Sequence, residues 1–179
     1  MGVAGVSARV ILVVSGSDRP GLTRALAEAV HAAGGNWLES HLSRLGGKYV
    51  GSVLVEIDAE QLPGFEQAIR RVDALGLQVA LVPAGDEPPP SGAILSLELV
   101  GQDRPGIVRE VTGVLARLDV NIEDFATRTE NGAWSGERLF RASARLSIPP
   151  GVTSDEVQTA LEAISGEIMV DFSFTAPVN

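Results

Sequence analysis

The sequence predicts an α+β protein made of two consecutive domains, each with the element order strand, helix, strand, strand, helix, strand. Three observations support this: an internal repeat, apolar spacings that switch between strand and helix periods, and a proline-rich segment between the halves. The chain has 179 residues, of which 45% are hydrophobic. That length accommodates one ordinary domain or two small ones, and the apolar fraction suffices for a packed core in either case.

The repeat is clearest in a short polar loop. The segment Gly16-Ser17-Asp18-Arg19-Pro20-Gly21 returns as Gly101-Gln102-Asp103-Arg104-Pro105-Gly106, an offset of 85 residues. The same offset maps Asn36 onto Asn121 without a gap. The two halves therefore follow one plan.

Three consecutive prolines separate the halves, and such a run favours an extended spacer over helix or sheet. We therefore predict a first domain at 1–85, a proline-rich linker at 86–92 and a second domain at 93–179. The first 85 residues contain 7 basic and 8 acidic side chains, and the remainder contains 7 basic and 15 acidic ones. The excess negative charge lies in the second half.

In the first half, the β-branched run 10–14 predicts a buried strand, and 17–21 is the loop that follows it. Apolar residues at helical spacing from Leu22 to Ala33 predict a helix, with Pro20 in its first turn and a stop at Gly34-Gly35. Segments 36–45 and 49–57 flank a glycine-containing turn and predict a hairpin. A second helix after Pro63 and a strand over 77–81 complete the half.

The second half repeats this order. Its fourth predicted segment alternates, with Phe140, Ala142, Ala144, Leu146 and Ile148 on one face. The closing helix begins at Thr153 with Glu156 three residues later, which is a capping-box pattern. About eighty residues arranged βαββαβ, twice over, predict two tandem ferredoxin-like domains, each an antiparallel sheet with two helices on one face.

Composition excludes several classes of function. The chain has no cysteine, so it has no disulfide framework and no thiolate nucleophile or ligand. A formal charge of -9 opposes direct contact with nucleic acid or an anionic membrane. The longest apolar run is too short to span a bilayer, and residues 1–8 lack the features of a signal peptide. We expect a soluble, cytoplasmic protein.

The predicted fold hosts RNA binders, metal carriers and small-molecule sensors, so its loops must discriminate between them. Each repeat offers one aromatic residue in its third strand, Tyr49 or Phe140, which disfavours RNA stacking. His31 and His41 are too few and too distant to suggest a metal site. Leu22 stands where a phosphate-binding loop requires lysine. We expect no metal and no cofactor.

The duplicated loop has two interpretations. In one, Asp18 and Asp103 cap the following helices and the prolines preset their first turns. In the other, the loop binds a ligand: free backbone amides accept a carboxylate, while the Asp and Asn side chains take an ammonium group. Asn36 and Asn121 follow the two aspartates by eighteen residues, which places each amide beside the helix N-terminus if the first two strands are neighbours.

At these residues the sequence resembles the ACT domain family, regulatory modules that bind amino acids and related ligands. The resemblance covers about 8–83 and 93–175, and it rests on Asp-Arg-Pro-Gly, the later Asn and the element order. Asn121-Ile122-Glu123-Asp124 is similar to tandem-ACT regulators of the glycine cleavage system repressor type. The first repeat departs from that narrower pattern after Asn36.

The resemblance implies a ligand sensor that touches a transcription factor and does not contact DNA itself. It also implies the positions that contact the ligand. We expect the protein to form a homodimer. Carried over by position, the ligand residues are Asp18, Arg19, Pro20, Gly21, Leu22 and Asn36 in the first repeat, and Asp103, Arg104, Pro105, Gly106, Ile107 and Asn121 in the second.

Two other functions fit the same sequence: an interaction module that needs no ligand, and a subunit that regulates an enzyme of amino-acid metabolism in trans. We expect no catalysis, because no paired-carboxylate, nucleophile or metal signature is present. Arg128, Arg138, Arg141 and Arg145 form either a basic strip or a solvated face.

Overall fold

The computed structural model describes residues 6–72, 76–85, 92–132, 137–164, 166 and 168–174, with 170–174 described by their backbone alone. The chain divides into two compact units, residues 1–87 and 88–179. The predicted linker at 86–92 lies outside the described residues except for Gly92. Each unit is therefore described by itself.

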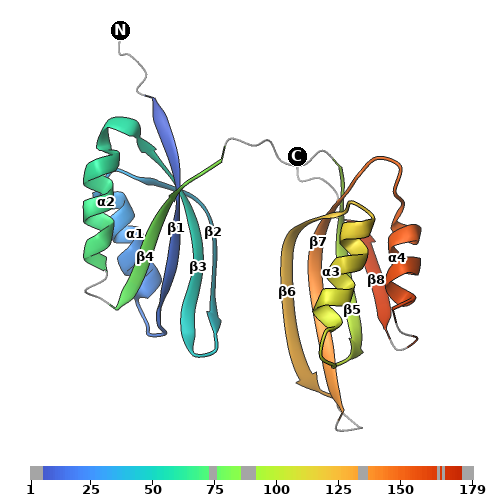
Figure 1. The fold of residues 1–179 in the computed structure, drawn as a ribbon. Coiled ribbons are helices and arrows are strands. Elements are labelled where there is room, and N and C mark those ends of the chain that lie inside the picture. Colours follow the sequence, from blue (N-terminus) through green and yellow to red (C-terminus); the bar gives the residue numbers. More distant parts are fainter. Residues whose placement is uncertain are drawn as a thin grey trace. The chain divides into compact units, whose positions relative to one another are not determined.

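The first unit has the predicted order of elements (Figure 1). Its elements are β1 (Ser7–Ser17), α1 (Leu22–Ala32), β2 (Asn36–Leu45), β3 (Lys48–Asp58), the short 3-10 helix η1 (Ala59–Gln61), α2 (Leu62–Arg70) and β4 (Leu77–Pro83).

The second unit repeats the arrangement. Its elements are β5 (Ala93–Gln102), α3 (Ile107–Arg117), β6 (Asn121–Asn131), β7 (Arg138–Ile148), α4 (Ser154–Glu162) and β8 (Met169–Phe174). The predicted capping box of α4 is confirmed: the Thr153 side chain accepts from the backbone amide of Glu156, whose carboxylate accepts from the amide of Thr153.

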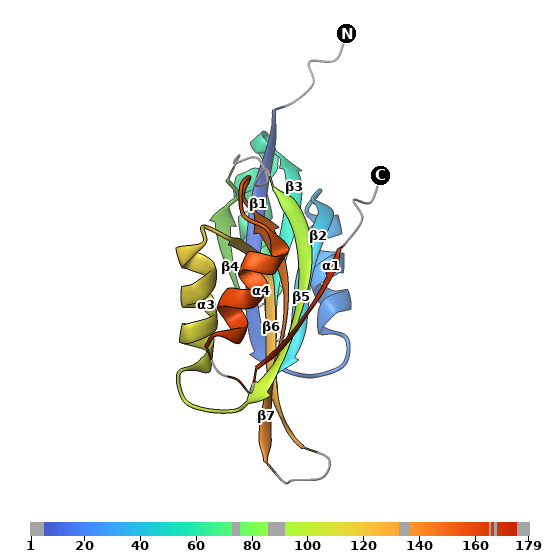
Figure 2. The same cartoon turned by 90° about the vertical axis from the view of Figure 1, so that its right-hand side faces the viewer.

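Each unit contains one antiparallel four-stranded sheet, with the order β2-β3-β1-β4 in the first unit and β6-β7-β5-β8 in the second. The two helices of a unit cover one face of its sheet, and no helix of the described residues lies on the other face (Figures 1 and 2). This is the predicted ferredoxin-like arrangement. The second strand is separated from the first by the third, because the hairpin brings the third strand back beside the first.

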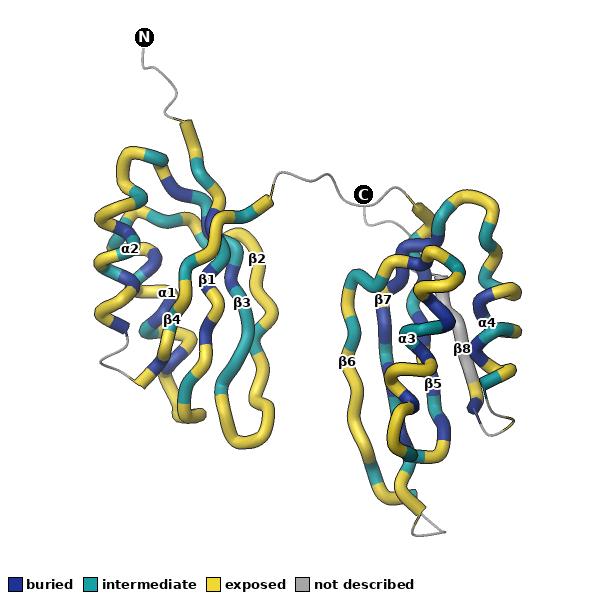
Figure 3. Tube along the Cα trace, viewed as in Figure 1, coloured by how far each residue is buried: buried dark blue, intermediate teal, exposed yellow. Residues whose placement is uncertain are grey.

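Along the central strands, every second side chain points to the helix-covered face of the sheet and packs in the hydrophobic core. In β1 the buried residues are Val10, Leu12 and Val14. Val13 and Ser15, which alternate with them, are exposed. In β7 the five alternating apolar residues from Phe140 to Ile148 are all buried, as predicted. Figure 3 shows the same contrast, with the edge strands β2 and β6 largely exposed beside more deeply buried central strands.

The turn after β1 is anchored to the rest of its unit. The hydroxyls of Thr23 on α1 and Tyr49 on β3 lie 2.7 Å apart and share a hydrogen bond. Tyr49 is paired with Gly16 in the β1–β3 ladder, so this bond ties the start of α1 to the level at which β1 ends.

Gly51 is a position in β3 where the neighbouring backbone leaves no room for a side chain. Its φ is +151°, and a Cβ atom there would lie 1.9 Å from the carbonyl oxygen of His41 on β2. We expect Gly51→Ala to destabilise the protein by about 2 kcal/mol or more, because the backbone of the edge strand would have to move.

Gly64→Ala is the matched control. Gly64 lies in α2 with no atom within 4 Å of a Cβ built there, so the same added methyl should leave stability unchanged or raise it by up to about 1 kcal/mol. Urea unfolding followed by far-ultraviolet circular dichroism measures both. Equal midpoints for the two variants would contradict the described β2–β3 contact.

Candidate functional site

The two Asp-Arg-Pro-Gly loops have the same backbone geometry. Gly21 is the N-cap residue of α1 with φ 92° and ψ -5°, and Gly106 is the N-cap residue of α3 with φ 90° and ψ -5°. This left-handed conformation strains any residue with a Cβ atom, which explains why glycine ends both loops. No side chain caps either helix.

The interpretation in which Asp18 and Asp103 cap the helices is wrong. Each aspartate precedes the N-cap glycine by three residues. Each carboxylate forms an ion pair with an arginine of the neighbouring hairpin. Asp18 Oδ2 lies 2.9 Å from Arg44 Nε, and Asp103 Oδ2 lies 3.7 Å from Arg138 Nε. The prolines also precede the N-cap glycines, so they shape the loop and not the first helical turn.

The predicted neighbourhood of Asp18 and Asn36 is also wrong, because β1 and β2 are not adjacent. Asn36 pairs with Glu56, which pairs with Arg9 near the beginning of β1. Asp18 follows Arg9 by nine residues, about 30 Å along an extended strand. Asn36 and Asp18 therefore lie at opposite ends of the unit.

The second unit has the same separation. Asn121 pairs with Ser147, which pairs with Ile94 near the beginning of β5, and Asp103 again comes nine residues later. No single unit can bring its Asp and its Asn to one amino-acid ligand. The two asparagines belong instead to other cavities, far from the loops.

The cavity beside Asn36 is acidic and that beside Asn121 is not. Asn36 lines a cavity of about 310 Å³ together with Glu56 and Asp58. Asn121 lines a cavity of about 580 Å³ together with Arg109 and Thr112 of α3. Asn121 Nδ2 donates a hydrogen bond of 2.8 Å to Glu123 Oε1.

Each unit also has a cavity where its first strand enters the Asp-Arg-Pro-Gly loop. The cavity at the end of β1 has about 500 Å³, and that at the end of β5 about 450 Å³. Sequence reasoning missed their lining residues. They could have been found from the alternation of buried and exposed residues in β1. This alternation continues past Val14 and places Ser15 and Ser17 on the sheet face opposite the helices. The lining residues are Ser15, Gly16, Ser17, Lys48, Val50, Gly76 and Gln78 in the first cavity, and Val100, Gly101, Gln102, Glu137, Leu139 and Met169 in the second.

The loop arginines have different surroundings. Both terminal nitrogens of Arg104 donate to the carboxylate of Glu110, at 2.8 and 2.5 Å. These hydrogen bonds lower the pKa of the Glu110 carboxyl below its ordinary value, against a smaller opposing effect of desolvation. The residue that corresponds to Glu110 in the first repeat is Ala25. The first repeat therefore has no carboxylate at the position from which Glu110 binds Arg104.

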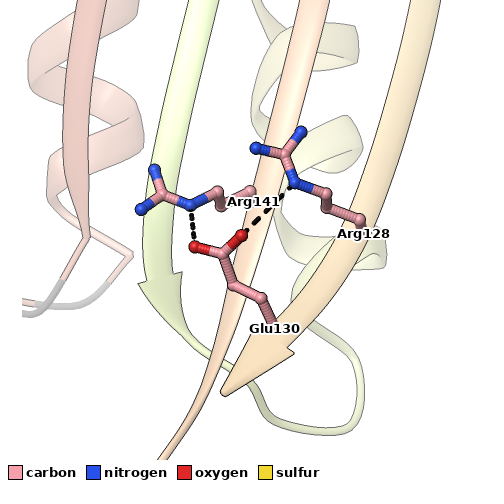
Figure 4. Close-up of polar contacts among 3 residues, drawn as sticks. All are labelled: Arg128, Glu130 and Arg141. Atoms are coloured by element: carbon pink, nitrogen blue, oxygen red, sulfur yellow. Dashed lines mark hydrogen bonds and ion pairs between the residues drawn. The ribbon is translucent and has the colours of Figure 1, made fainter. Parts of the chain in front are cut away.

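The predicted basic strip is interrupted by an acid. Arg128 on β6 and Arg141 on β7 are cross-strand partners, and Glu130 binds both (Figure 4). The hydrogen bond from Arg141 is the main cause of a lowered pKa at Glu130, and Arg128 adds to it. Arg138 is engaged with Asp103. The solvated, internally paired face is the interpretation that the structure supports.

Other predicted residues occupy ordinary positions. His31 is exposed in the last turn of α1, and His41 is exposed on β2, 3.1 Å from Glu39. Within the described residues, no group of three or more His, Asp or Glu side chains is placed to hold a metal ion. In the same part of the chain, no helix is both long enough and apolar enough to cross a membrane.

Because Asp18 does not cap α1, its removal should have little effect on stability. We expect Asp18→Ala to change the free energy of unfolding by less than about 1 kcal/mol, because it removes an ion pair whose arginine is 71% exposed and breaks no helix cap. Thr153→Ala removes an actual cap and should cost about 1 kcal/mol. Chemical denaturation of both variants checks this, and a larger loss for Asp18→Ala would restore the capping interpretation.

Comparison with known proteins agrees with this architecture. A family model described as ACT domain matches residues 8–81, and a second ACT domain model matches residues 95–144. No curated protein sequence matches the chain.

Two solved structures are similar over their whole length. An unknown protein from Galdieria sulphuraria is 28% identical, with a TM-score of 0.81 over 96% of this chain and 100% of that one. A protein described as a "putative glycine cleavage system transcriptional repressor" is 15% identical, with a TM-score of 0.72 over 95% of this chain and 99% of that one. The second likeness is one of fold. With both repeats matched by family models, the chain belongs to the ACT domain family as a tandem of two ACT domains, which are regulatory modules for small ligands.

Proposed function

We propose that this protein is a non-catalytic regulator that binds an amino acid such as glycine and acts by contacting a transcription factor. The observation that carries the proposal is the duplicated loop, whose N-cap glycines Gly21 and Gly106 agree to within 2° in φ and share the same ψ. In both halves the loop leads into a helix whose N-terminus no side chain caps, which supports a role for the loop in binding a ligand.

The loops offer the groups that an amino-acid zwitterion needs. Because no side chain caps α1 or α3, backbone amides of their first turns can donate to a carboxylate. The carboxylates of Asp18 and Asp103 lie at the same loops, and each is more than half covered, with 35% and 25% of the side chain exposed. Either can accept from an ammonium group if its arginine partner moves aside.

The proposed ligand contacts are the loops alone. Asn36 and Asn121, which the family resemblance adds, lie at the opposite ends of their units and beside other cavities. In the proposal they take no part in binding the same ligand molecule within one unit.

Signal transfer must follow from a difference in affinity between two states, because the proposal contains no catalytic step. The charge excess of the second half favours a protein partner over nucleic acid. The choice of a transcription factor rests on the fold that the chain shares with the structure described as a repressor. We expect the regulator to act as a homodimer.

Calorimetric titration of the full chain with the common amino acids tests ligand binding. Glycine has about five heavy atoms, so a ceiling near 1.5 kcal/mol per atom limits its affinity to roughly micromolar. We expect the double variant Asp18→Ala, Asp103→Ala to lose the heat of binding, while the single variant Asp155→Ala, which removes an acidic side chain from α4 and leaves both loops unchanged, retains it. If no amino acid gives heat with the unaltered protein, the sensor proposal fails.

Affinity capture from the native host, with and without the bound amino acid, tests the partner. The proposal expects a transcription factor whose recovery changes with the amino acid. Recovery of a metabolic enzyme would favour the trans-acting subunit, and a partner whose recovery ignores the amino acid would favour a ligand-independent module.

A further inference from the structure

The cavities at the ends of β1 and β5 occupy the same place in the two units, and this permits a position-by-position comparison. In the ladders Ser15 is paired with both Val50 and Gln78, and its counterpart Val100 is paired with both Arg141 and Met169. Both cavities lie on the sheet face that carries no helix, because buried Val14 and Leu99 beside them point to the other face.

The first cavity is lined by groups that donate hydrogen bonds. Lys48 Nζ donates to Ser17 Oγ at 3.2 Å, which holds the ammonium group over the end of β1. Ser15 and Gln78 add a hydroxyl and a carboxamide from the paired strands β1 and β4. Of the described residues that line this cavity, none is acidic.

A second cation, Arg19 of the loop, lies near one of the residues that line the cavity. One terminal nitrogen of Arg19 lies 3.9 Å from the place where a Cβ atom at Gly76 would be, and Gly76 lines the cavity. In the second unit, Glu110 binds both terminal nitrogens of Arg104, and so occupies the guanidinium with a carboxylate of the same chain. The first repeat has Ala25 at that position.

The second cavity differs at three of these register positions, while Gln102 keeps a polar side chain in the place of Ser17. Val100 replaces Ser15, Met169 replaces Gln78, and Leu139, which pairs with Gln102, replaces Lys48, which pairs with Ser17. At the register of Val50 the second unit has Arg141, which is bound to Glu130. Glu137 adds a carboxylate to the lining of the second cavity. The same backbone therefore presents an ammonium group, hydroxyls and a carboxamide in the first unit, but three apolar side chains, one carboxamide and one acid in the second.

We propose that the cavity at the end of β1 binds the carboxylate of a small ligand through Lys48, Ser17 and Arg19, and that the equivalent cavity of the second unit does not. The inference rests on the proposed function and changes it in one respect: in the first repeat, the side chains of Lys48, Ser17 and Arg19 bind the carboxylate of the sensed amino acid in place of the backbone amides of α1. In the second repeat, Glu110 already supplies the carboxylate to the loop arginine.

Amide chemical shifts of the ¹⁵N-labelled full chain, titrated separately with sodium acetate and with glycine, test the inference. Sodium chloride at equal ionic strength serves as the reference for screening. We expect both probes to shift the amides of Ser15, Ser17 and Lys48, with no saturable shift at Val100, Gln102 or Leu139.

Lys48→Leu gives the first cavity the residue that the second has at the same register. Lys48 is exposed, so the variant should fold, and the unshifted remainder of the spectrum will report that it does. We expect acetate affinity to fall about tenfold, the effect of losing one charge-assisted hydrogen bond. Arg24→Met is the matched control, because it removes an 83%-exposed cation from α1, on the other side of the sheet.

The possible results separate the inference from the proposed function. Glycine binding with unchanged affinity in Lys48→Leu, or acetate shifts centred on the second cavity, would overturn the inference and leave the sensor proposal intact. A complete absence of saturable shifts with both probes would overturn the inference, and the sensor proposal would fall with it only if calorimetry also finds no heat with any of the common amino acids.

Discussion

The antiparallel pairing of the first strand with the third, β1 with β3 and β5 with β7, is the constraint on which the other features of each unit depend. Backbone hydrogen bonds along this ladder fix the level of every side chain on the sheet, because a slip of one residue would turn the buried row of β1 outward. The same ladder places Lys48 opposite Ser17 and separates Asn36 from Asp18 by the length of the strand.

The two units show how one backbone can be kept while its chemistry changes. The loop conformations at Gly21 and Gly106 are nearly the same, and glycine stands at both positions because a left-handed residue before the helix strains a side chain. The lining of the cavities beside them faces solvent and is free of that constraint. Side chains there can diverge at little cost to stability, which allows a duplicated domain to acquire two different binding preferences.

Secondary structure was largely predictable from the sequence. The alternation in 140–148, the helical spacing after Leu22 and the capping box at Thr153 are local patterns with local causes, and all three are confirmed. The interpretation of Asp18 as a helix cap was wrong because residue type alone does not reveal the first helical residue. Gly21 in the left-handed region begins the helix three residues later.

The sequence by itself determined that the protein is a tandem of two βαββαβ domains, because periodicity and the repeated loop are properties of the chain. Only the tertiary structure decided which groups meet. The third strand inserts between the first two, so Asp18 and Asn36 are separated, while Ser15, Lys48 and Gln78 from three strands converge on one cavity. That convergence depends on strand order and register, which are set by pairing between segments distant in the sequence.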